Sequence, residues 1–331
     1  MILGIDISAA VFDVVSFDGI KRSTARTFNN TDSGHKAFIK YAQKLKPTMI
    51  GMEATGVYHI NLALALVDAG LSVSVINPLS IKSFAKAKLR NVKTDAADAA
   101  LIAEFTHVMK PGPWKAPTKQ HIALKDLTRR INRLTRDKAR EKNRLHALTT
   151  KRSGEALIED TTEAIVHIEQ RLQRLINAAM AIIAEDPALS RALTNLASAK
   201  GVGQTSAMAL LGEFVMMDKA MKAKQVSRFA GLDVTITRSG SSVRGVSRIS
   251  KAGNMYLRCA MYMPAMCVSH TEAHAEAFKA RLEGNGKTRK QAIAALMRKM
   301  LMGLWKVYVT EQSFDPTKLY HVDIKREMIA N

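Results

Sequence analysis

The spacing of apolar residues over the first 110 positions changes repeatedly between the period of a strand and that of a helix. Apolar runs of strand length occupy residues 2–7, 11–17, 49–53 and 71–76, and the more polar segment 22–28 is a further predicted strand. Apolar residues at helical spacing occupy 35–45, 58–69 and 81–89. This alternation predicts an α/β domain, a mixed sheet with helices on its faces. In such sheets, functional residues gather at strand ends and at the starts of neighbouring helices.

The pattern becomes long-helical after residue 117. Three prolines at 111, 113 and 117 cannot continue a helix and mark a boundary. Apolar residues then recur at steps of three and four from Leu124 to Leu148 and from Ile165 to Ile182, which predicts an antiparallel helical hairpin. The predicted domains are therefore an α/β domain at 1–110, a coiled-coil hairpin at 118–186, a mostly helical domain at 187–312 and a tail at 313–331.

Charge points to a polyanionic partner. The 331 residues include 50 Lys and Arg against 29 Asp and Glu, a formal net charge of +21. Nucleic acid is the leading candidate for the partner. No apolar run reaches about 18 residues, so we expect no membrane span, and we expect a cytoplasmic protein without a signal peptide. Cys259 and Cys267 form no metal-ligand pattern and are predicted to be buried thiols in a reducing compartment.

Four acidic residues stand where catalytic groups would be expected. Asp6 lies inside the first apolar strand and Glu53 closes the fourth, and a buried carboxylate needs a partner, a sheet edge or a cation. Thr94 is a candidate N-cap that places Asp95 and Asp98 on one face of a helix. Acids are common in a first turn because the helix dipole favours them, so that pair alone does not establish a metal site. Together, the four carboxylates could converge at one end of the sheet and bind two Mg²⁺ about 4 Å apart for phosphodiester cleavage.

Basic residues crowd the first arm of the predicted hairpin, among them Arg129, Arg130 and Arg133. Few acids accompany them, which favours contact with a nucleic-acid backbone over a merely solvated helix face. A single hairpin also leaves apolar residues for a second copy of the chain. Further along, Gly201 and Gly203 lie between two helical segments and indicate a helix-hairpin-helix motif that binds phosphate, or else a plain turn.

A second stretch of candidate chemistry spans residues 237–254. It is rich in small hydroxyl residues, and its cations would neutralise phosphate: Arg238, Arg244, Arg248 and Lys251. A nucleophilic serine is conceivable there, although serines in such loops more often form turns or contact phosphate, and no histidine stands nearby as a base.

Three segments of the first region closely resemble the DEDD motifs of the insertion-sequence transposases related to the Piv pilin-gene invertase. They are residues 4–8 (GIDIS), 52–58 (MEATGVY) and 94–99 (TDAADA). The resemblance implies a RuvC-like ribonuclease-H fold for residues 1–110. It also implies that Asp6, Glu53, Asp95 and Asp98 form the family's Mg²⁺-dependent acidic tetrad.

Residues 231–233, 238–240, 248–254 and 256–258 resemble the C-terminal transposase domain of the same family, which carries a serine that links covalently to DNA. We match Ser239 to that serine, and Ser241 is the alternative because neighbouring serines leave the alignment ambiguous by two residues. The resemblance covers nearly the whole chain. It implies that the acidic tetrad and the serine assemble into one composite site across protomers of a dimer or tetramer.

The resemblance thus implies a DNA transposase or site-specific recombinase that cleaves and exchanges strands of donor and target DNA. It further implies guidance by a structured bridge RNA from the element, which the residues by themselves do not reveal. Three other classes remain open. They are a Holliday-junction-type nuclease that uses water as nucleophile, a sugar-kinase-like or actin-like ATPase, and a non-catalytic nucleic-acid-binding protein.

Overall fold

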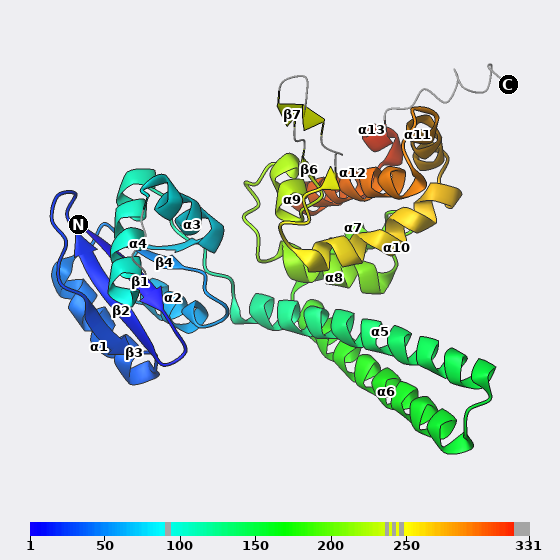
Figure 1. Cartoon of the computed structure of the whole chain (residues 1–331), viewed down its shortest axis with the longest axis horizontal. Coiled ribbons are helices and arrows are strands. Elements are labelled where there is room, and N and C mark those ends of the chain that lie inside the picture. Colours follow the sequence, from blue (N-terminus) through cyan, green and yellow to red (C-terminus); the bar gives the residue numbers. More distant parts are fainter. Residues whose placement is uncertain (90–93, 236–237, 240–242, 245–247, 321–331) are drawn as a thin grey trace. The chain divides into compact units, whose positions relative to one another are not determined.

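Figure 1 shows a computed structural model of the chain, which describes residues 1–89, 94–235, 238–239, 243–244 and 248–320. The chain divides into two units, Met1–Ala116 and Pro117–Asn331. The division falls at the end of the proline-rich segment, where prolines prevent a continuous helix from joining the units. The finer division of the second unit at residue 187 stays a prediction. Within the described residues, no helix has the length and apolar composition needed to cross a bilayer.

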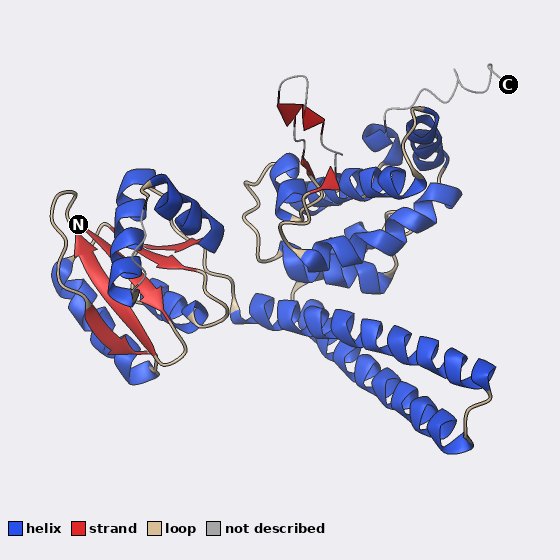
Figure 2. Cartoon of the chain, in the orientation of Figure 1, coloured by secondary structure: helices blue, strands red, loops and turns tan. Residues whose placement is uncertain are grey.

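The first unit is built on a mixed sheet with the strand order β3-β2-β1-β4-β5. The strands are β1 (Ile2–Ile7), β2 (Val11–Phe17), β3 (Arg26–Asn29), β4 (Met49–Glu53) and β5 (Val73–Ile76). Strands β1 to β3 pair antiparallel, whereas β1, β4 and β5 run parallel. The helices α1 (Asp32–Leu45), α2 (His59–Asp68), α3 (Pro78–Ala87) and α4 (Asp95–Met109) cover the sheet (Figure 2). This architecture confirms the predicted fold class of a mixed sheet with flanking helices, followed by a mostly helical remainder.

Alternation of side chains gives β1 two different faces. Leu3 and Ile5 point to one face, where they are fully buried in a cluster with Phe38 of α1 and Leu62 of α2. Complete burial of such side chains removes them from water and stabilises the fold by about 1.5–3 kcal/mol each. This apolar cluster fixes α1 and α2 against one side of the sheet.

The opposite face of the sheet carries α4 at unusually close range. A Cβ added to Gly4 of β1 would clash with the backbone nitrogen of Ala103 and the carbonyl oxygen of Ala99, both in α4. Gly51, which opposes Gly4 in the parallel register of β4, meets the side chain of Thr106 in the same way. Two adjacent glycines therefore form a floor on which α4 rests with its backbone almost against the strand.

The element boundaries differ from the predicted ones where polar side chains take over backbone hydrogen bonds. Helix α1 starts at Asp32 rather than at 35, because the Thr31 hydroxyl accepts the amide of Gly34 at 3.3 Å and caps an earlier turn. Strand β3 starts at Arg26 rather than at 22. Ser23 bonds Ser16 through its amide and its hydroxyl, so the ladder is interrupted before β3 begins.

The second unit combines a long helical hairpin with a packed helical domain (Figure 1). The hairpin consists of α5 (Lys119–Lys151) and α6 (Glu155–Glu185), as predicted. The other helices are α7 (Pro187–Ala197), α8 (Gln204–Phe214), α9 (Ala223–Phe229), α10 (Met255–Thr271), α11 (Ala273–Gly284), α12 (Arg289–Thr310) and α13 (Pro316–Tyr320). Two ribbons of two-residue strands complete the unit, β6 (Val234–Thr235) with β9 (Arg248–Ile249) and β7 (Arg238–Ser239) with β8 (Val243–Arg244).

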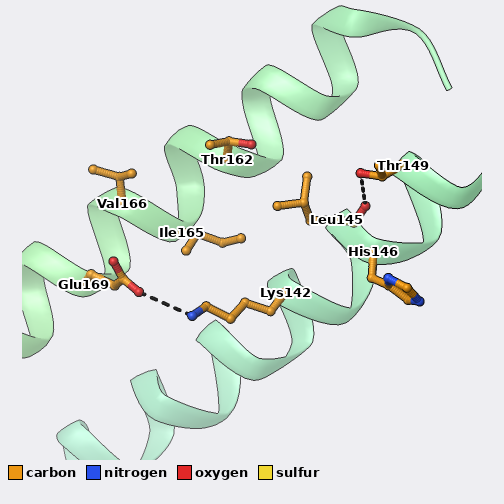
Figure 3. A pocket seen from close by; sticks show the side chains of 8 residues that line it. All are labelled: Lys142, Leu145, His146, Thr149, Thr162, Ile165, Val166 and Glu169. Carbon is orange, nitrogen blue, oxygen red and sulfur yellow. Dashed lines mark hydrogen bonds and ion pairs between the residues drawn. The ribbon is translucent and has the colours of Figure 1, made fainter. Parts of the chain in front are cut away.

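One apolar core joins the root of the hairpin to the helical domain. Leu124 and Ile131 of α5 and Ile183 of α6 belong to the same buried cluster as Met208 of α8 and Leu301 of α12. Away from the root, the arms enclose a shallow cavity of about 510 Å³ (Figure 3). Its centre is apolar, with Leu145 and Ile165 between the arms, and Lys142 of α5 forms an ion pair with Glu169 of α6 at 3.6 Å.

The two cysteines are not buried as predicted. Cys259 is half-buried and Cys267 is exposed. The buried face of α10 passes through Leu257, Met261 and Val268 at helical spacing, and the two cysteines lie off that face. The prediction was wrong because it relied on the apolar character of the surrounding sequence, whereas the helical spacing of the buried residues places both cysteines outside the buried face.

Substituting Gly4 with Ala should separate α4 from the sheet, since the added methyl group meets backbone atoms that cannot move independently. We expect a loss of about 1–3 kcal/mol in unfolding free energy. Amide hydrogen exchange of residues 95–109 should be faster in the variant than in wild type, which would show that α4 is the element that has loosened. Gly112→Ala is the matched control, because a Cβ there would meet nothing within 4 Å. Equal exchange in the two variants would contradict the close packing of α4.

Candidate functional site

The register of the sheet places two of the predicted acids side by side. The last registered pair of β1 and β4 is Ile5 with Met52, so Asp6 and Glu53 occupy the next positions on neighbouring parallel strands. Each acid follows a floor glycine by two residues and therefore projects from the same face of the sheet, the face that carries α4. On the other side of β1, Asp13 lies opposite Asp6, and its carboxylate accepts a hydrogen bond from Thr27 at 2.5 Å.

The other two acids come from the first turn of α4. As predicted, Thr94 is the N-cap, and its hydroxyl accepts the amide of Ala97 at 3.2 Å. Asp95 and Asp98 follow at the positively polarised end of the helix, where carboxylates are favoured. Because Ala99 already lies over Gly4, the turn that precedes it is directed toward the end of β1 where Asp6 stands.

Electrostatics show that the four carboxylates come together. The pKa of Asp6 is raised from its ordinary 3.8 to about 6, chiefly by burial and then by the nearby negative charges of Asp98, Asp95 and Glu53, in that order. Repulsion from three named carboxylates requires all four groups to share one region. Such a cluster of hard oxygen donors suits a divalent cation, which would offset the repulsion.

The carboxylates are near one another without forming a closed ligand shell. Among the described residues, no group of three or more His, Cys, Asp or Glu side chains lies close enough together to hold a metal ion. Oxygen ligands of Mg²⁺ approach the ion at about 2.0–2.1 Å, and several of its ligands are usually water or substrate phosphate. The arrangement therefore supplies the donor chemistry for Mg²⁺, while the assignment of individual ligands stays a prediction.

In the second unit, the predicted serine lies on a short ribbon. Ser239 is the last residue of β7, and its backbone pairs with Val243 of β8. Arg238 and Arg244 pair across the same ribbon, so two predicted phosphate-binding residues flank the serine by backbone position. Ser241, the alternative nucleophile, lies outside the described residues.

The base of this ribbon is tightly clipped together. Lys251 donates its amide to the carbonyl of Gly231 at 3.0 Å, Asn254 donates to Phe229 at 2.7 Å, and the Ser250 hydroxyl donates to Asp233 at 2.5 Å. These contacts join the segment before β6 to the segment after β9. These hydrogen bonds fix residues 229–233 against residues 250–254, the two segments between which the short strands lie.

A buried ion pair connects this clip to the hairpin. Glu213 of α8 is only 3% exposed, and Arg129 of α5 donates two hydrogen bonds to it at 2.6 and 2.9 Å. Asn254 donates its side-chain amide to the same carboxylate at 2.5 Å and caps α10 by accepting the amides of Tyr256 and Leu257. The guanidinium of Arg129 also stacks over the ring of Tyr256, 4.6 Å from its centroid.

The predicted nucleic-acid contacts on α5 thus fall into different environments. Arg129 donates its hydrogen bonds to the buried Glu213, so its guanidinium is already occupied and is a poor candidate for direct contact with DNA. Arg133 is exposed and donates to the Tyr256 hydroxyl at 2.8 and 3.1 Å, and Arg130 is exposed. Only the exposed pair retains the geometry of a phosphate contact.

The two glycines of the predicted helix-hairpin-helix motif have different roles. Gly201 has a φ of +82°, and a Cβ there would lie 2.9 Å from Val268 of α10, so a glycine is needed for packing. Gly203 is the N-cap of α8, makes no side-chain cap, and would leave an added Cβ in open space. The amides that begin α8 can therefore receive a phosphate oxygen, as the prediction requires.

Sequence reasoning missed Glu213. A single carboxylate within the apolar run of α8 was the available indication, since such a residue is almost never buried without a partner. Its partners come from residues 129 and 254, which are distant in sequence. Only the packing of α5 and α10 against α8 identifies them.

Comparison with known proteins relates the chain to transposases and DNA-inverting proteins. Residues 3–153 match a family model described as "Transposase", and residues 193–280 match one described as "Transposase IS116/IS110/IS902 family". The pilin gene-inverting proteins of Moraxella bovis and Moraxella lacunata are each 30% identical over 322 residues, covering 95% of this chain and 97% of the relative.

Among solved structures, the first unit is similar to RuvC of Thermus thermophilus. That structure is 14% identical, covers 34% of this chain and 98% of its own, and has a TM-score of 0.28. Thermus thermophilus RuvC in complex with a Holliday junction substrate gives 15% identity over the same shares, with a TM-score of 0.27.

Replacing Asp6 with Asn should change how stability depends on pH. The folded-state pKa of Asp6 is about 6, against 3.8 for an ordinary Asp, so the wild type loses stability relative to Asp6→Asn as pH rises through this interval. At pH 7.5 without divalent cations, the variant should exchange the amides of β1 and α4 more slowly. Added Mg²⁺ should slow exchange in the wild type only. The control removes an exposed carboxylate, Asp68→Asn. No difference between wild type and Asp6→Asn would contradict the clustering of charge.

Substituting Glu213 with Ala should strongly destabilise the second unit, because it leaves Arg129 and Asn254 without their acceptor. We expect a loss near the lower end of about 3–5 kcal/mol, since a third of the Arg129 side chain is exposed. Glu169→Ala is the matched control. Its two ion pairs are long and half-exposed, and their loss should cost no more than about 1 kcal/mol. Urea unfolding followed by circular dichroism measures the difference, and similar losses for the two variants would contradict the role of Glu213.

Proposed function

The chain belongs to the IS116/IS110/IS902 family of transposases, and from this premise we propose that it cleaves and exchanges DNA strands through a serine nucleophile activated by Mg²⁺. The observation that carries the proposal is the raised pKa of Asp6, to which, after burial, the negative charges of three further carboxylates from β4 and α4 contribute. The chain as a whole carries a net charge of +21, which attracts phosphate. A cluster of carboxylates within such a protein suits a bound metal ion, because the ion can bind the carboxylates and a phosphate at the same time.

In this proposal, Asp6, Glu53, Asp95 and Asp98 hold the metal. Two ions fit the family resemblance, and when bound they would act as Lewis acids on the scissile phosphate and on the attacking oxygen. The carboxylates from β1 and β4 form the fixed part of the site because their strands are paired. The two on α4 add oxygen donors at a helix terminus whose partial positive charge favours anions.

Ser239 is the proposed nucleophile. Its Oγ attacks phosphorus, the bond from phosphorus to the 3′ oxygen breaks, and the hydroxyl proton ends on that 3′ oxygen. The products are a 5′-phosphoserine link and a free 3′-hydroxyl. A 3′-hydroxyl from the second DNA then attacks the phosphoserine, which restores a phosphodiester and releases the serine.

The proposed partners are donor and target duplexes, a structured guide RNA and further copies of the chain. The exposed cations Arg130 and Arg133 of α5 and Arg248 of β9 support contact with nucleic-acid backbones. Sequence choice by base pairing to RNA would explain why phosphate-binding residues predominate among the candidates. Two duplexes must be cut and rejoined, so we propose a dimer or tetramer in which the metal site and the serine of different protomers act together.

The first test incubates the protein with flank RNA, Mg²⁺ and labelled donor and target DNA, followed by denaturing gels with and without protease treatment. Wild type should form a protease-sensitive DNA adduct. Ser239→Ala should lose it because no Oγ is present, and Asp95→Ala should lose it because the metal site is incomplete. Lys306→Ala is the control for a surface substitution on α12 and should retain it. Cleavage without an adduct in Ser239→Ala would indicate water as nucleophile and a resolvase-like nuclease.

Mixing variants separates assembly from chemistry. If the composite site combines two protomers, Ser239→Ala mixed with Asp95→Ala should recover part of the adduct that each lacks alone. No recovery would contradict assembly across protomers. An adduct that survives in Ser239→Ala but disappears in Ser241→Ala would transfer the nucleophile to Ser241.

A further inference from the structure

The second unit contains a cavity that the proposed strand transfer does not use. It has a volume of about 670 Å³ and lies between the β6/β9 ribbon, the end of α11 and the first half of α12. Its apolar wall comes from Leu232, Val234, Ile249, Leu282 and Ala294. The size falls within the range of small-molecule sites, about 300–1,000 Å³. Figure 1 shows the elements that border it.

The remaining wall of the cavity is strongly basic. Among the described residues that line it there is no acid, and there are five cations: Arg248, Lys251, Lys287, Lys290 and Arg298. Over the part of the chain that the structure describes, none of the five forms an ion pair with a carboxylate, although nine such pairs with other cations are present. A concave surface that combines uncompensated cations with an apolar wall suits a ligand with an anionic part and a flat apolar part.

One of these cations has an unusual backbone conformation. Lys251 has a φ of +52°, a left-handed conformation that a side chain other than Gly or Asn rarely adopts. It is maintained by the clip at the base of the ribbon, where the Lys251 amide donates to Gly231. Strained residues of this kind persist where surrounding contacts enforce them. The clip thereby fixes the backbone of Lys251, which lines the cavity.

We propose that this cavity receives a single unpaired nucleotide of a bound nucleic-acid strand, with the base against the apolar wall and its phosphate among the lysines. The proposal rests on the proposed function, since it presumes a nucleic-acid substrate. A duplex hides the faces of its bases within the stack and offers phosphates and groove edges only. An unpaired nucleotide offers both a base face and a phosphate, which match the two halves of the cavity wall.

Ala294 provides a selective test. It is half-buried and lines the cavity, so Ala294→Phe fills the space for a base without changing any charge. Lys287→Ala with Lys290→Ala removes charge from the rim of the cavity. Lys306→Ala is the matched control, because Lys306 is an exposed cation on the same helix and does not line the cavity.

The experiment measures the affinity of the full-length protein for labelled oligonucleotides by fluorescence anisotropy at one salt concentration. The probes are single-stranded DNA, the same DNA with abasic sites, single-stranded RNA and a DNA duplex. Wild type should bind intact single strands more tightly than abasic ones. Ala294→Phe should lose about tenfold in affinity for intact strands, the free energy of stacking one base, and bind the duplex unchanged. The double lysine variant should lose affinity for every probe, and Lys306→Ala should match wild type.

Unchanged single-strand affinity in Ala294→Phe, or equal wild-type affinity for intact and abasic strands, would overturn the assignment and leave a basic surface without a base pocket. Duplex binding by Ala294→Phe shows that the variant is folded. Comparing the affinities for single-stranded DNA and single-stranded RNA identifies which kind of strand supplies the nucleotide. If wild type binds none of the probes, the proposed function fails as well, whereas a failure confined to the cavity variant concerns the cavity alone.

Discussion

The close packing of α4 on two glycines governs the organisation of the first unit. Gly4 and Gly51 lie side by side in β1 and β4; the backbone of α4 occupies the space of a side chain at Gly4, and the Thr106 side chain of α4 occupies that space at Gly51. Each glycine is followed after one residue by an acid, Asp6 or Glu53, on the same face of the sheet. A larger residue at either glycine would lift the helix and move Asp95 and Asp98 away from the strand acids. Packing and chemistry therefore depend on the same contact.

Carboxylates in such a cluster destabilise one another, and their repulsion adds to burial in raising the pKa of Asp6 to about 6. Folds retain strain of this kind mainly where function needs it. The apolar cluster on the other face of the sheet, around Phe38 and Leu62, supplies the stability that allows the acids to remain together. The basic excess of the whole chain is what a protein needs to bring phosphate toward an acidic centre.

In the second unit, Glu213 has a comparable role. It connects the hairpin through Arg129 with the start of α10 through Asn254, and Asn254 also closes the clip at the base of the serine ribbon. The position of the hairpin and the position of the ribbon are therefore linked within one body. A residue such as Arg129, which looked like a surface cation in the sequence, contributes by positioning other elements.

The sequence by itself determined the strands and helices of the first unit, the helical hairpin and the candidate chemistry, but it predicted a loop where the short strands β7 to β9 lie. Apolar periodicity predicted the strands and the hairpin because burial imposes a period of two or of three and four. The short motifs around Asp6, Glu53 and Asp95 were recognisable because local capping and strand patterns place the acids. What periodicity could not supply were contacts between distant residues: the glycine floor under α4, the carboxylate of Glu213 between Arg129 and Asn254, the exposure of Cys267, and the joint cavity of β9 and α12. Those depend on which faces meet in three dimensions, and only the tertiary packing decides that.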